Sequence, residues 1–269
     1  MTARGLFVAP FDALAEPTVL ADLAVEAEDA GWDGFFVWDH LLYDPPVQAI
    51  ADPWICCAAV AVRTTRLLLG PMVTPLSRRR PHVLARQAVT LDRLSGGRLV
   101  LGFGLGDDGG VGELSRFGEE TEPRVRAAQL DEGLDLLREL LSGEQVDHDG
   151  VHFAARDVRF LPGPARPEGI PFWIGGRWPN EAPLRRAARF EGAFVISLPG
   201  PEGLAQVRDA VAAARDGGLV GFDVVVELPP GDDPAPWAEA GAGWLLTRVG
   251  PYEIDLAEAR RVVRAGPAG

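Results

Sequence analysis

Residues 67–103 read LLLGPMVTPLSRRRPHVLARQAVTLDRLSGGRLVLGF. The runs 67–73 and 99–103 are apolar without alternation, which is typical of strands buried on both faces of a parallel sheet. Between them, residues 82–94 carry apolar side chains at helical spacing, and the Ser-Gly-Gly turn at 95–97 ends that pattern. The stretch therefore predicts a strand, a helix and a second strand of one parallel sheet.

The same alternation runs through the rest of the chain. Further strands are expected at residues 6–9, 35–38, 172–174, 193–196, 224–227 and 244–247. Further helices are expected at residues 17–31, 53–62, 123–141, 183–190, 201–215, 236–240 and 256–265. Residues 143–160, with a turn at Asp149-Gly150, predict a hairpin insertion. Eight strand–helix units predict one α/β domain, residues 1–269, folded as a (β/α)8 TIM barrel; an open doubly wound sheet is the alternative.

Length, composition and charge exclude several classes of protein. The 269 residues are 47% hydrophobic and 24% charged, which suffices for a large core and excludes a disordered chain. The apolar stretches 55–62 and 67–73 fall short of the roughly 20 residues that cross a bilayer. A net charge of -13 repels nucleic acid and anionic membrane surfaces, so neither is an expected partner. The N-terminus reads as a strand rather than as an apolar leader, and a cytoplasmic location is expected.

Residue types exclude further chemistry. All 26 basic residues are arginine, so no lysine is present to form a Schiff base, hold pyridoxal phosphate or serve a phosphate loop. Cys56 and Cys57 are adjacent in an apolar run and are expected to be packing residues. The four histidines lack the spacing of a metal-binding motif, so no metal site is expected.

The residues that follow the predicted strands are the candidates for chemistry, because active sites of such barrels lie where strands end. The second strand ends in Trp38-Asp39-His40, the third in Val73-Thr74-Pro75, and the fourth runs through Gly102, Gly104 and Gly106. The last glycine comes one residue too early for a dinucleotide-binding fingerprint. A dinucleotide site is therefore not indicated.

Five segments at these strand ends and the turns before them carry a resemblance to a known family. They are Ala30-Gly31-Trp32-Asp33-Gly34, Val37-Trp38-Asp39-His40, Val73-Thr74-Pro75, Leu91-Asp92-Arg93-Leu94-Ser95-Gly96-Gly97-Arg98 leading into Gly102-Phe103-Gly104, and Phe172-Trp173-Ile174-Gly175-Gly176. Together they closely resemble the bacterial luciferase-like monooxygenase family, which includes oxidoreductases that use the deazaflavin coenzyme F-420. The likeness covers most of residues 5–200.

The resemblance implies that FMN or coenzyme F-420 lies across the mouth of the barrel. It implies a bulge at Val73 and Thr74 that presses on the ring system, often with a non-prolyl cis peptide bond in this family. It also implies that the backbone of Gly104, Leu105 and Gly106 approaches the ring. The alternatives are a plain strand end before proline and a flexible glycine-rich loop.

The phosphate of such a cofactor needs arginines and free backbone amides in a chain of this net charge. The resemblance implies Gly175, Gly176, Arg177 and Arg126 for this role, and exposed arginines without a ligand are the alternative. The arginine triple at 78–80 could bind a polyanionic cofactor tail or form a solvated helix start.

Three tryptophans, Trp38, Trp54 and Trp178, are either walls of an apolar substrate pocket or packing residues. A homodimer is expected, with residues 55–62 and 84–91 as the contact faces.

The resemblance implies hydride transfer between the reduced cofactor and a small organic substrate, or delivery of the hydride to oxygen by a monooxygenase. F-420 is favoured over FMN, because the Trp38-Asp39-His40 ending is typical of that branch. His40 is the candidate catalytic proton carrier, since imidazole titrates near neutral pH. Asp39 points the other way along the strand and is expected to fix a loop or an arginine. A catalytically silent flavin-binding or sensory protein on the same barrel is the alternative.

Overall fold

A closed parallel barrel forms the centre of the computed structural model, which describes residues 2–252 and 255–267. Its strands are β1 (Ala3–Val8), β2 (Gly34–Val37), β3 (Leu68–Pro71), β4 (Thr74–Pro75), β5 (Leu101–Gly104), β8 (Phe172–Arg177), β9 (Gly192–Ile196), β10 (Asp223–Leu228) and β11 (Trp244–Val249). They follow the order β3-β2-β1-β11-β10-β9-β8-β5-β4, and every recorded strand pair in this sheet is parallel. The predicted TIM-barrel fold is confirmed.

The two ends of this sheet meet. Strand β4 pairs with β5, and β3 lies against the residues just before β5 through a bridge between Leu69 and Leu99. The amide of Leu69 donates to Arg98 O at 3.0 Å, and Val100 N donates to Leu69 O at 2.9 Å. Strands β3 and β4 are thus one interrupted barrel position, and the alternative of an open doubly wound sheet is wrong.

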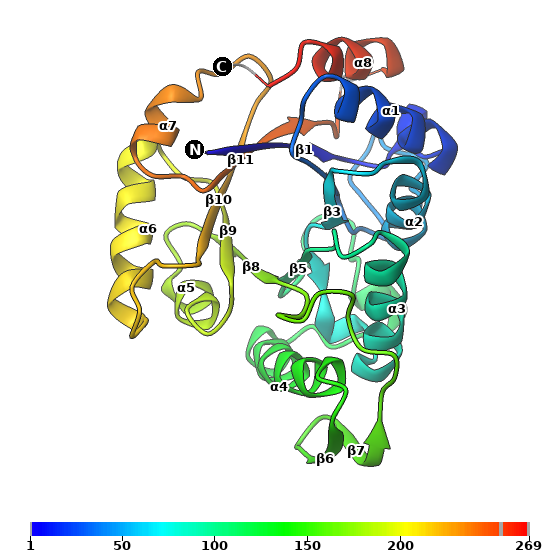
Figure 1. The fold of residues 1–269 in the computed structure, drawn as a ribbon, viewed down its shortest axis with the longest axis vertical. Coiled ribbons are helices and arrows are strands. Elements are labelled where there is room, and N and C mark those ends of the chain that lie inside the picture. Colours follow the sequence, from blue (N-terminus) through cyan, green and yellow to red (C-terminus); the bar gives the residue numbers. More distant parts are fainter. Residues whose placement is uncertain (1, 253–254, 268–269) are drawn as a thin grey trace.

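Helices surround the barrel on its outer side (Figure 1). They are α1 (Pro17–Asp29), α2 (Pro53–Arg63), α3 (Pro81–Leu94), α4 (Pro123–Leu141), α5 (Glu181–Ala187), α6 (Pro201–Ala214), α7 (Ala235–Glu239) and α8 (Leu256–Arg264). Proline occupies the first turn of most of them, where its missing N–H costs nothing. In the described part of the chain, no helix is long and apolar enough to span a bilayer.

The predicted hairpin insertion is present as β6 (Gln145–Asp149) and β7 (Ala154–Arg159), which project beyond α4 (Figure 1). The turn differs from the prediction, since β6 continues through Asp149 and the chain reverses over residues 150–153. Glu132 of α4 explains the shift. Its carboxylate accepts hydrogen bonds from the amides of Val151, His152 and Phe153, and this fixes the turn.

Two apolar layers make up the core. The barrel interior holds mainly large side chains, namely Phe7, Phe36, Met72, Val100, Trp173, Phe194, Val225, Trp244 and Leu246. The larger layer lies between strands and helices and includes Cys56 and Cys57, which are fully buried and form no disulfide. Burial raises the pKa of Cys56 to about 12 and that of Cys57 well above its usual value. The prediction that both are packing residues is confirmed.

The turn after α3 is held by internal hydrogen bonds. Asp92, fully buried, accepts a hydrogen bond from the amide of Ala165 at 2.7 Å. The hydroxyl of Ser95 donates to Asp92 O at 2.9 Å. Gly96 and Gly97 both have positive φ, which glycine adopts without steric cost. The Asp-Arg-Leu-Ser-Gly-Gly-Arg run is therefore a structural motif that joins α3 to β5.

Glu28 ties the end of α1 to the start of β3. Its carboxylate accepts hydrogen bonds from the amides of Thr65, Arg66 and Leu67 at 3.0, 2.6 and 3.1 Å. Burial would raise the pKa of Glu28, but these backbone donors outweigh it and lower the pKa to about 2. The ionised carboxylate is thus the form that the folded chain stabilises.

Replacing Glu28 with glutamine is expected to lower the free energy of unfolding at pH 7 by about 1–3 kcal/mol, because charged hydrogen-bond acceptors are lost. The native pKa lies below the ordinary value, so the contribution of Glu28 is full above about pH 4.5 and disappears as the pH falls toward 2. Urea unfolding at pH 7 and pH 3 measures this, with Glu181→Gln, an exposed side chain paired with Arg185, as control. A difference that stays constant over this pH range contradicts the assignment.

Candidate functional site

The strand ends that sequence reasoning singled out do come together at the carboxyl edge of the barrel. Val73 lies between two glycines: a Cβ atom on Gly104 would be 2.6 Å from Val73 Cγ2, and one on Gly175 would be 2.8 Å from Val73 Cγ1. Val73 and Thr74 follow the interruption between β3 and β4, and the Met72–Val73 peptide bond is cis. The strand is therefore interrupted at Met72 and Val73, and the two glycines are explained by contact with the Val73 side chain.

The loop after β5 is fixed rather than flexible at its start. Gly106 has a φ of +75°, and a Cβ there would lie 2.9 Å from Pro75 Cβ. Arg126 of α4 is buried and donates from Nη1 to Leu105 O and Gly106 O, both at 3.0 Å. Arg126 thus holds the backbone that the resemblance assigns to the cofactor ring. A direct contact of Arg126 with a phosphate stays a prediction.

Gly176 and Arg177 end strand β8. A Cβ on Gly176 would lie 2.6 Å from Pro183 Cβ, so a larger residue would push against the first turn of α5. Arg177 is exposed and donates from Nη1 to Ser197 Oγ at 2.9 Å. Most of its N–H donors are thus available, and its predicted role in holding a phosphate stays a prediction.

Asp39 is the centre of a buried ionic network. Its carboxylate accepts from Arg78 Nη2 at 2.6 Å, from Arg79 Nη2 at 3.0 Å and from Thr74 Oγ1 at 2.7 Å. The expectation that Asp39 fixes an arginine is confirmed. The hydrogen bond from Thr74 also connects the end of β2 to the start of β4, so Asp39 fixes the position of these two parts of the mouth relative to each other.

The solvated helix start is wrong for the first two members of the arginine triple at 78–80, whereas binding of a polyanionic cofactor tail stays a prediction. The Arg78 side chain is only 4% exposed and pairs with Asp39 and with Glu113, whose Oε1 lies 3.0 Å from Arg78 Nη1. Arg79 is largely buried against Asp39 and the Trp54 ring. Only Arg80, at the start of α3, is exposed as a solvated helix start. The first two guanidinium groups are inside because buried carboxylates compensate them.

His40 pairs with Glu113, a residue that sequence reasoning missed. His40 Nδ1 lies 3.1 Å from Glu113 Oε2, and Glu113 Oε1 accepts from the amide of Leu41. Burial would raise the pKa of Glu113, but the bond and charge of His40 and the charge of Arg78 outweigh it and lower that pKa. Glu113 lies 73 positions from His40 in an irregular glycine-rich loop, where periodicity gives no signal.

Aromatic rings surround His40 on one side. The Tyr43 ring is centred 5.0 Å from the imidazole, Trp38 6.0 Å and Phe11 6.1 Å. Trp38 packs against the cluster in the barrel interior beside His40, and its role as a wall of a substrate pocket stays a prediction. Trp54 and Trp178 instead pack in the layer between strands and helices.

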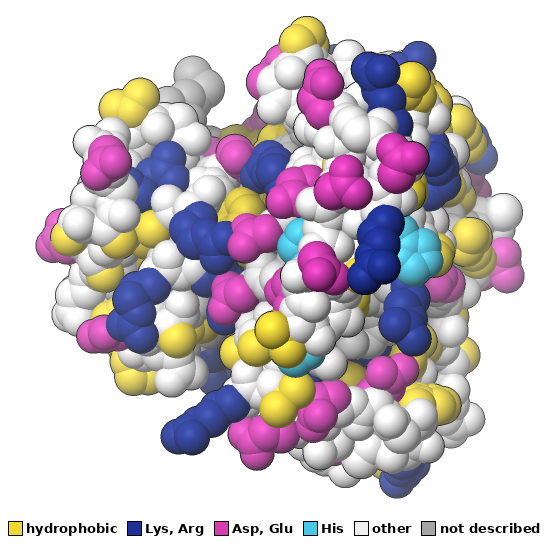
Figure 2. All heavy atoms as spheres, turned by 90° about the horizontal axis from the view of Figure 1, so that it is seen from below, with side chains coloured by type: hydrophobic (Ala, Val, Ile, Leu, Met, Phe, Trp, Pro, Cys, Tyr) yellow, Lys and Arg dark blue, Asp and Glu magenta, His cyan; other side chains and the backbone are white. Residues whose placement is uncertain are grey.

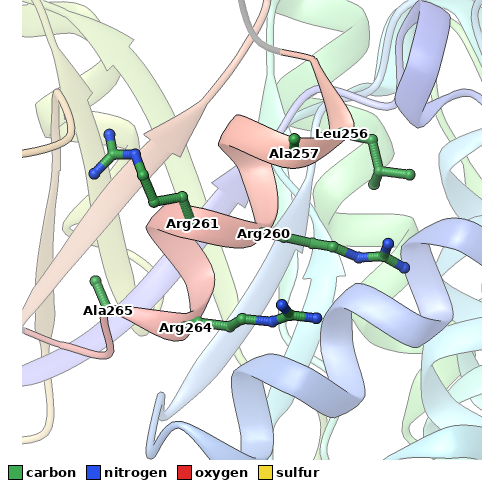
Figure 3. Close-up of a pocket in the computed structure, with 6 residues that line it drawn as sticks. All are labelled: Leu256, Ala257, Arg260, Arg261, Arg264 and Ala265. Atoms are coloured by element: carbon green, nitrogen blue, oxygen red, sulfur yellow. The ribbon is translucent and has the colours of Figure 1, made fainter.

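Two hollows lie outside this group. One of about 820 Å³ lies over α8, where Arg260 and Arg264 extend on one side of the helix and Arg261 on the other (Figure 3). Arg260 and Arg264 both pair with Glu26 there. The other, of about 280 Å³, reaches Ser197, Glu227 and Asp232 at the carboxyl ends of β9 and β10. Within residues 2–252 and 255–267, no group of three or more His, Cys, Asp or Glu is placed to hold a metal ion.

Comparison with known proteins gives consistent matches. The sequence profile of the family described as luciferase-like monooxygenase matches residues 7–235. An F-420-dependent glucose-6-phosphate dehydrogenase of Nakamurella multipartita is 36% identical over 185 residues, which are 67% of this chain and 52% of that protein. One of Mycolicibacterium smegmatis is 32% identical over 252 residues, 89% of this chain and 74% of that protein. The chain spans about half the length of the relatives from Nakamurella multipartita and Microbacterium testaceum.

Solved structures agree with the fold. An F-420-dependent secondary alcohol dehydrogenase superposes with a TM-score of 0.80 at 17% identity, covering 98% of this chain and 97% of that one. A monooxygenase from Streptomyces bottropensis superposes with a TM-score of 0.79 at 20% identity, with the same coverage. At these identities, the likeness establishes the architecture.

Proposed function

The chain belongs to the luciferase-like monooxygenase family, and on that premise we propose that it is an oxidoreductase that transfers hydride between a reduced deazaflavin or flavin and a small organic substrate. The observation that carries the proposal is the His40–Glu113 pair beside the surface made by Val73, Gly104 and Gly175. His40 follows Asp39, whose carboxylate accepts a hydrogen bond from Thr74, the residue after Val73, and this link supports a proton-carrying role for His40 beside the proposed ring.

The residues at the mouth fit a flat, polar ring system. The Val73 side chain fills the space where Cβ atoms of residues 104 and 175 would lie, so Val73 and bare glycine backbone adjoin one another there. The buried indole nitrogen of Trp38 and the buried Nε of Arg126 have no hydrogen-bond partner within the protein. Gly175, Gly176 and Arg177 would hold the cofactor's phosphate, and Val73, Thr74 and residues 104–106 its ring. When bound, F-420 or FMN supplies the hydride-carrying ring, and F-420 is the favoured cofactor because the relatives above are named for it.

The protein's own part in the reaction is proton transfer and positioning. In the neutral tautomer with its proton on Nδ1, His40 donates to the carboxylate of Glu113, and Nε2 is then the nitrogen that accepts a proton. Arg78 holds Glu113 in place, and Asp39 holds Arg78. His40 Nε2 then takes a proton from the substrate as hydride leaves it, or returns one in the reverse direction.

Titration with F-420 and with FMN tests the cofactor assignment. We expect saturable quenching with a dissociation constant in the micromolar range or below, tighter for F-420. Gly104→Ala should weaken binding at least tenfold, because the added Cβ displaces Val73, whereas Gly217→Ala, in open space, should not. No binding of either cofactor at high micromolar concentration contradicts the redox function. Binding without turnover of any substrate favours the silent flavin-binding protein instead.

We also propose a homodimer that forms through α2. This helix has no charged side chain from Pro53 to Val62, and Ile55 and Val62 are 61% and 62% exposed. A surface helix that is apolar all round is usually covered by a partner. The expected face at residues 84–91 needs correction, because Leu84 and Leu91 are buried in the core, and Val83 and Leu94 are the exposed apolar residues of α3.

Sedimentation velocity checks this assembly. The wild-type chain, of 28.8 kDa, is expected to sediment as a dimer at micromolar concentration. Ile55→Asp should shift it to a monomer, because burying an unpaired carboxylate at the interface is unfavourable. Val220→Asp, at an 86% exposed position in the loop before β10, serves as control and should leave the dimer intact. A wild-type monomer, or a dimer that survives Ile55→Asp, contradicts the proposal.

A further inference from the structure

The half of the barrel mouth opposite Val73 carries an inward-facing ion pair. Val225 of β10 and Leu246 of β11 lie in the barrel interior. Side chains alternate along a strand, so Glu227 and Arg248, each two residues further on, face the same way. Glu227 Oε1 lies 3.5 Å from Arg248 Nη1, and the two side chains are 18% and 37% exposed. The pair therefore lies inside the mouth, near the carboxyl ends of β10 and β11.

This pair and His40 face the same space. Tyr43, whose ring contacts the imidazole of His40, also contacts Tyr252, which follows β11. Burial raises the pKa of Tyr43 to about 12, and the positive charge of Arg248 opposes that rise. Arg248 is thus near the aromatic wall of the site. A substrate held between the cofactor surface and His40 meets Glu227 and Arg248 on its far side.

The charge of Arg248 is neutralised before any ligand arrives. In the described part of the chain, Glu227 is the one carboxylate paired with Arg248. Burial raises the pKa of Glu227, and the charges of Arg248 and Arg177 counteract it. Within residues 2–252 and 255–267, no side chain or amide donates a hydrogen bond to the Glu227 carboxylate, so its lone pairs remain available to a ligand. The Glu227–Arg248 pair thus offers a ligand a carboxylate that accepts hydrogen bonds, and it carries no net charge.

The space beside Glu227 has a second carboxylate in its lining, and the Arg177 guanidinium contacts Ser197 at its edge. The hollow of about 280 Å³ at the ends of β9 and β10 is lined by Glu227 and Asp232, together with Ser197 and Trp237. An anionic group in this space would meet two carboxylates. A hydroxyl group there would donate a hydrogen bond to an oxygen that lacks one. Arginine and acidic side chains are likewise interspersed over the face that Figure 2 shows, without a large region of positive charge.

We propose that Glu227 determines the charge of the substrate: by pairing with Arg248 it makes the site accept a small uncharged molecule bearing hydroxyl groups and reject a phosphorylated one. The inference rests on the proposed function, because it takes the substrate to lie between the cofactor surface and His40. It separates this chain from the relatives named for glucose 6-phosphate, whose named substrate carries a phosphate.

Binding of inorganic phosphate to the cofactor-free protein tests the masking of Arg248. Glu227→Gln keeps the shape of the side chain and removes its charge, so Arg248 becomes available to an oxyanion. By isothermal titration at constant ionic strength, this variant is expected to bind phosphate at least tenfold more tightly than the wild type. The double variant Glu227→Gln with Arg248→Met should lose the gain. Glu258→Gln, which frees Arg261 on the exposed face of α8, is the matched control and should gain nothing.

Equal phosphate affinity in the wild type and Glu227→Gln overturns the proposal, as does a gain that survives Arg248→Met. A second titration, of the F-420-loaded enzyme with glucose and with glucose 6-phosphate, tests the substrate class directly. We expect the uncharged sugar to bind the wild type more tightly, and any other order, including no binding of either, contradicts that class. Failure of F-420 to bind refutes the proposed function instead, and the phosphate result with cofactor-free protein still decides whether Glu227 masks Arg248.

Discussion

Replacing His40 with alanine is expected to lower turnover by roughly 10²- to 10⁴-fold, the usual contribution of a positioned acid or base, while leaving cofactor affinity nearly unchanged. The imidazole is the titratable side chain held at the mouth by Glu113, and its loss leaves no other histidine near the proposed cofactor surface among the described residues. Steady-state kinetics with a confirmed substrate and cofactor fluorescence measure the two effects. His82→Ala, at an exposed position of α3, is the control and should retain full activity.

The Glu113→Gln variant distinguishes positioning from catalysis. Glutamine keeps the hydrogen bond to His40 but removes the negative charge that favours a protonated imidazole, so the pH at which activity is half-maximal should fall. A smaller loss of turnover than in His40→Ala, together with this displacement of the pH profile, is expected. Turnover of His40→Ala within a few-fold of the wild type assigns the proton to another group and leaves His40 a structural residue.

Local signals were sufficient for most of the fold. The bounds of α4, residues 123–141, agree with the prediction because Pro123 fixes the first turn and leucines continue the apolar face to its end. The predicted strand positions agree with the observed ones, because short apolar runs without alternation are typical of strands that are buried on both faces of a parallel sheet. The turn of the hairpin was misplaced, since Glu132, 18 residues before Gly150, holds it from another element.

The site was predicted only where it lies on strand ends. Asp39 and His40 follow a predicted strand and Val73 is the last residue of another, so the architecture itself points to them. Glu113 lies in an irregular loop, and its pairing with His40 depends on a path that no local pattern specifies. The sequence suggested that Arg78 binds a polyanion or is solvated. In the structure it pairs with two buried carboxylates, Asp39 and Glu113, which come from other parts of the chain. A run of arginines in the sequence gives no information about such distant partners.

Arg98 completes the turn that follows α3. Its guanidinium donates to Ser95 O, Thr64 Oγ1, Leu67 O, Ala61 O and Thr64 O, at distances between 2.7 and 2.9 Å. Ser95 lies at the end of α3, and the other acceptors belong to the end of α2 and to the segment that leads into β3. Burial lowers the pKa of Arg98, and the charge of Glu28 opposes this. A single side chain thus satisfies the carbonyls at which α2, β3 and the turn before β5 meet.

Arg98→Met is therefore expected to lower the free energy of unfolding by about 3–5 kcal/mol, because it retains much of the side-chain volume but leaves several half-buried carbonyls without a donor. Urea unfolding followed by circular dichroism measures the change in midpoint and slope. Arg93→Met, in the same motif, is the matched control: Arg93 is exposed and makes one long contact, 3.4 Å to Gly163 O, so its loss should cost less than 0.5 kcal/mol. Equal costs for the two variants contradict a stabilising role for Arg98. A large cost confined to Arg98 supports a role for the Asp92–Arg98 run in closing the barrel between β3 and β5. Val73 lies three residues after Gly70 of β3, so this closure also bears on the position of Val73.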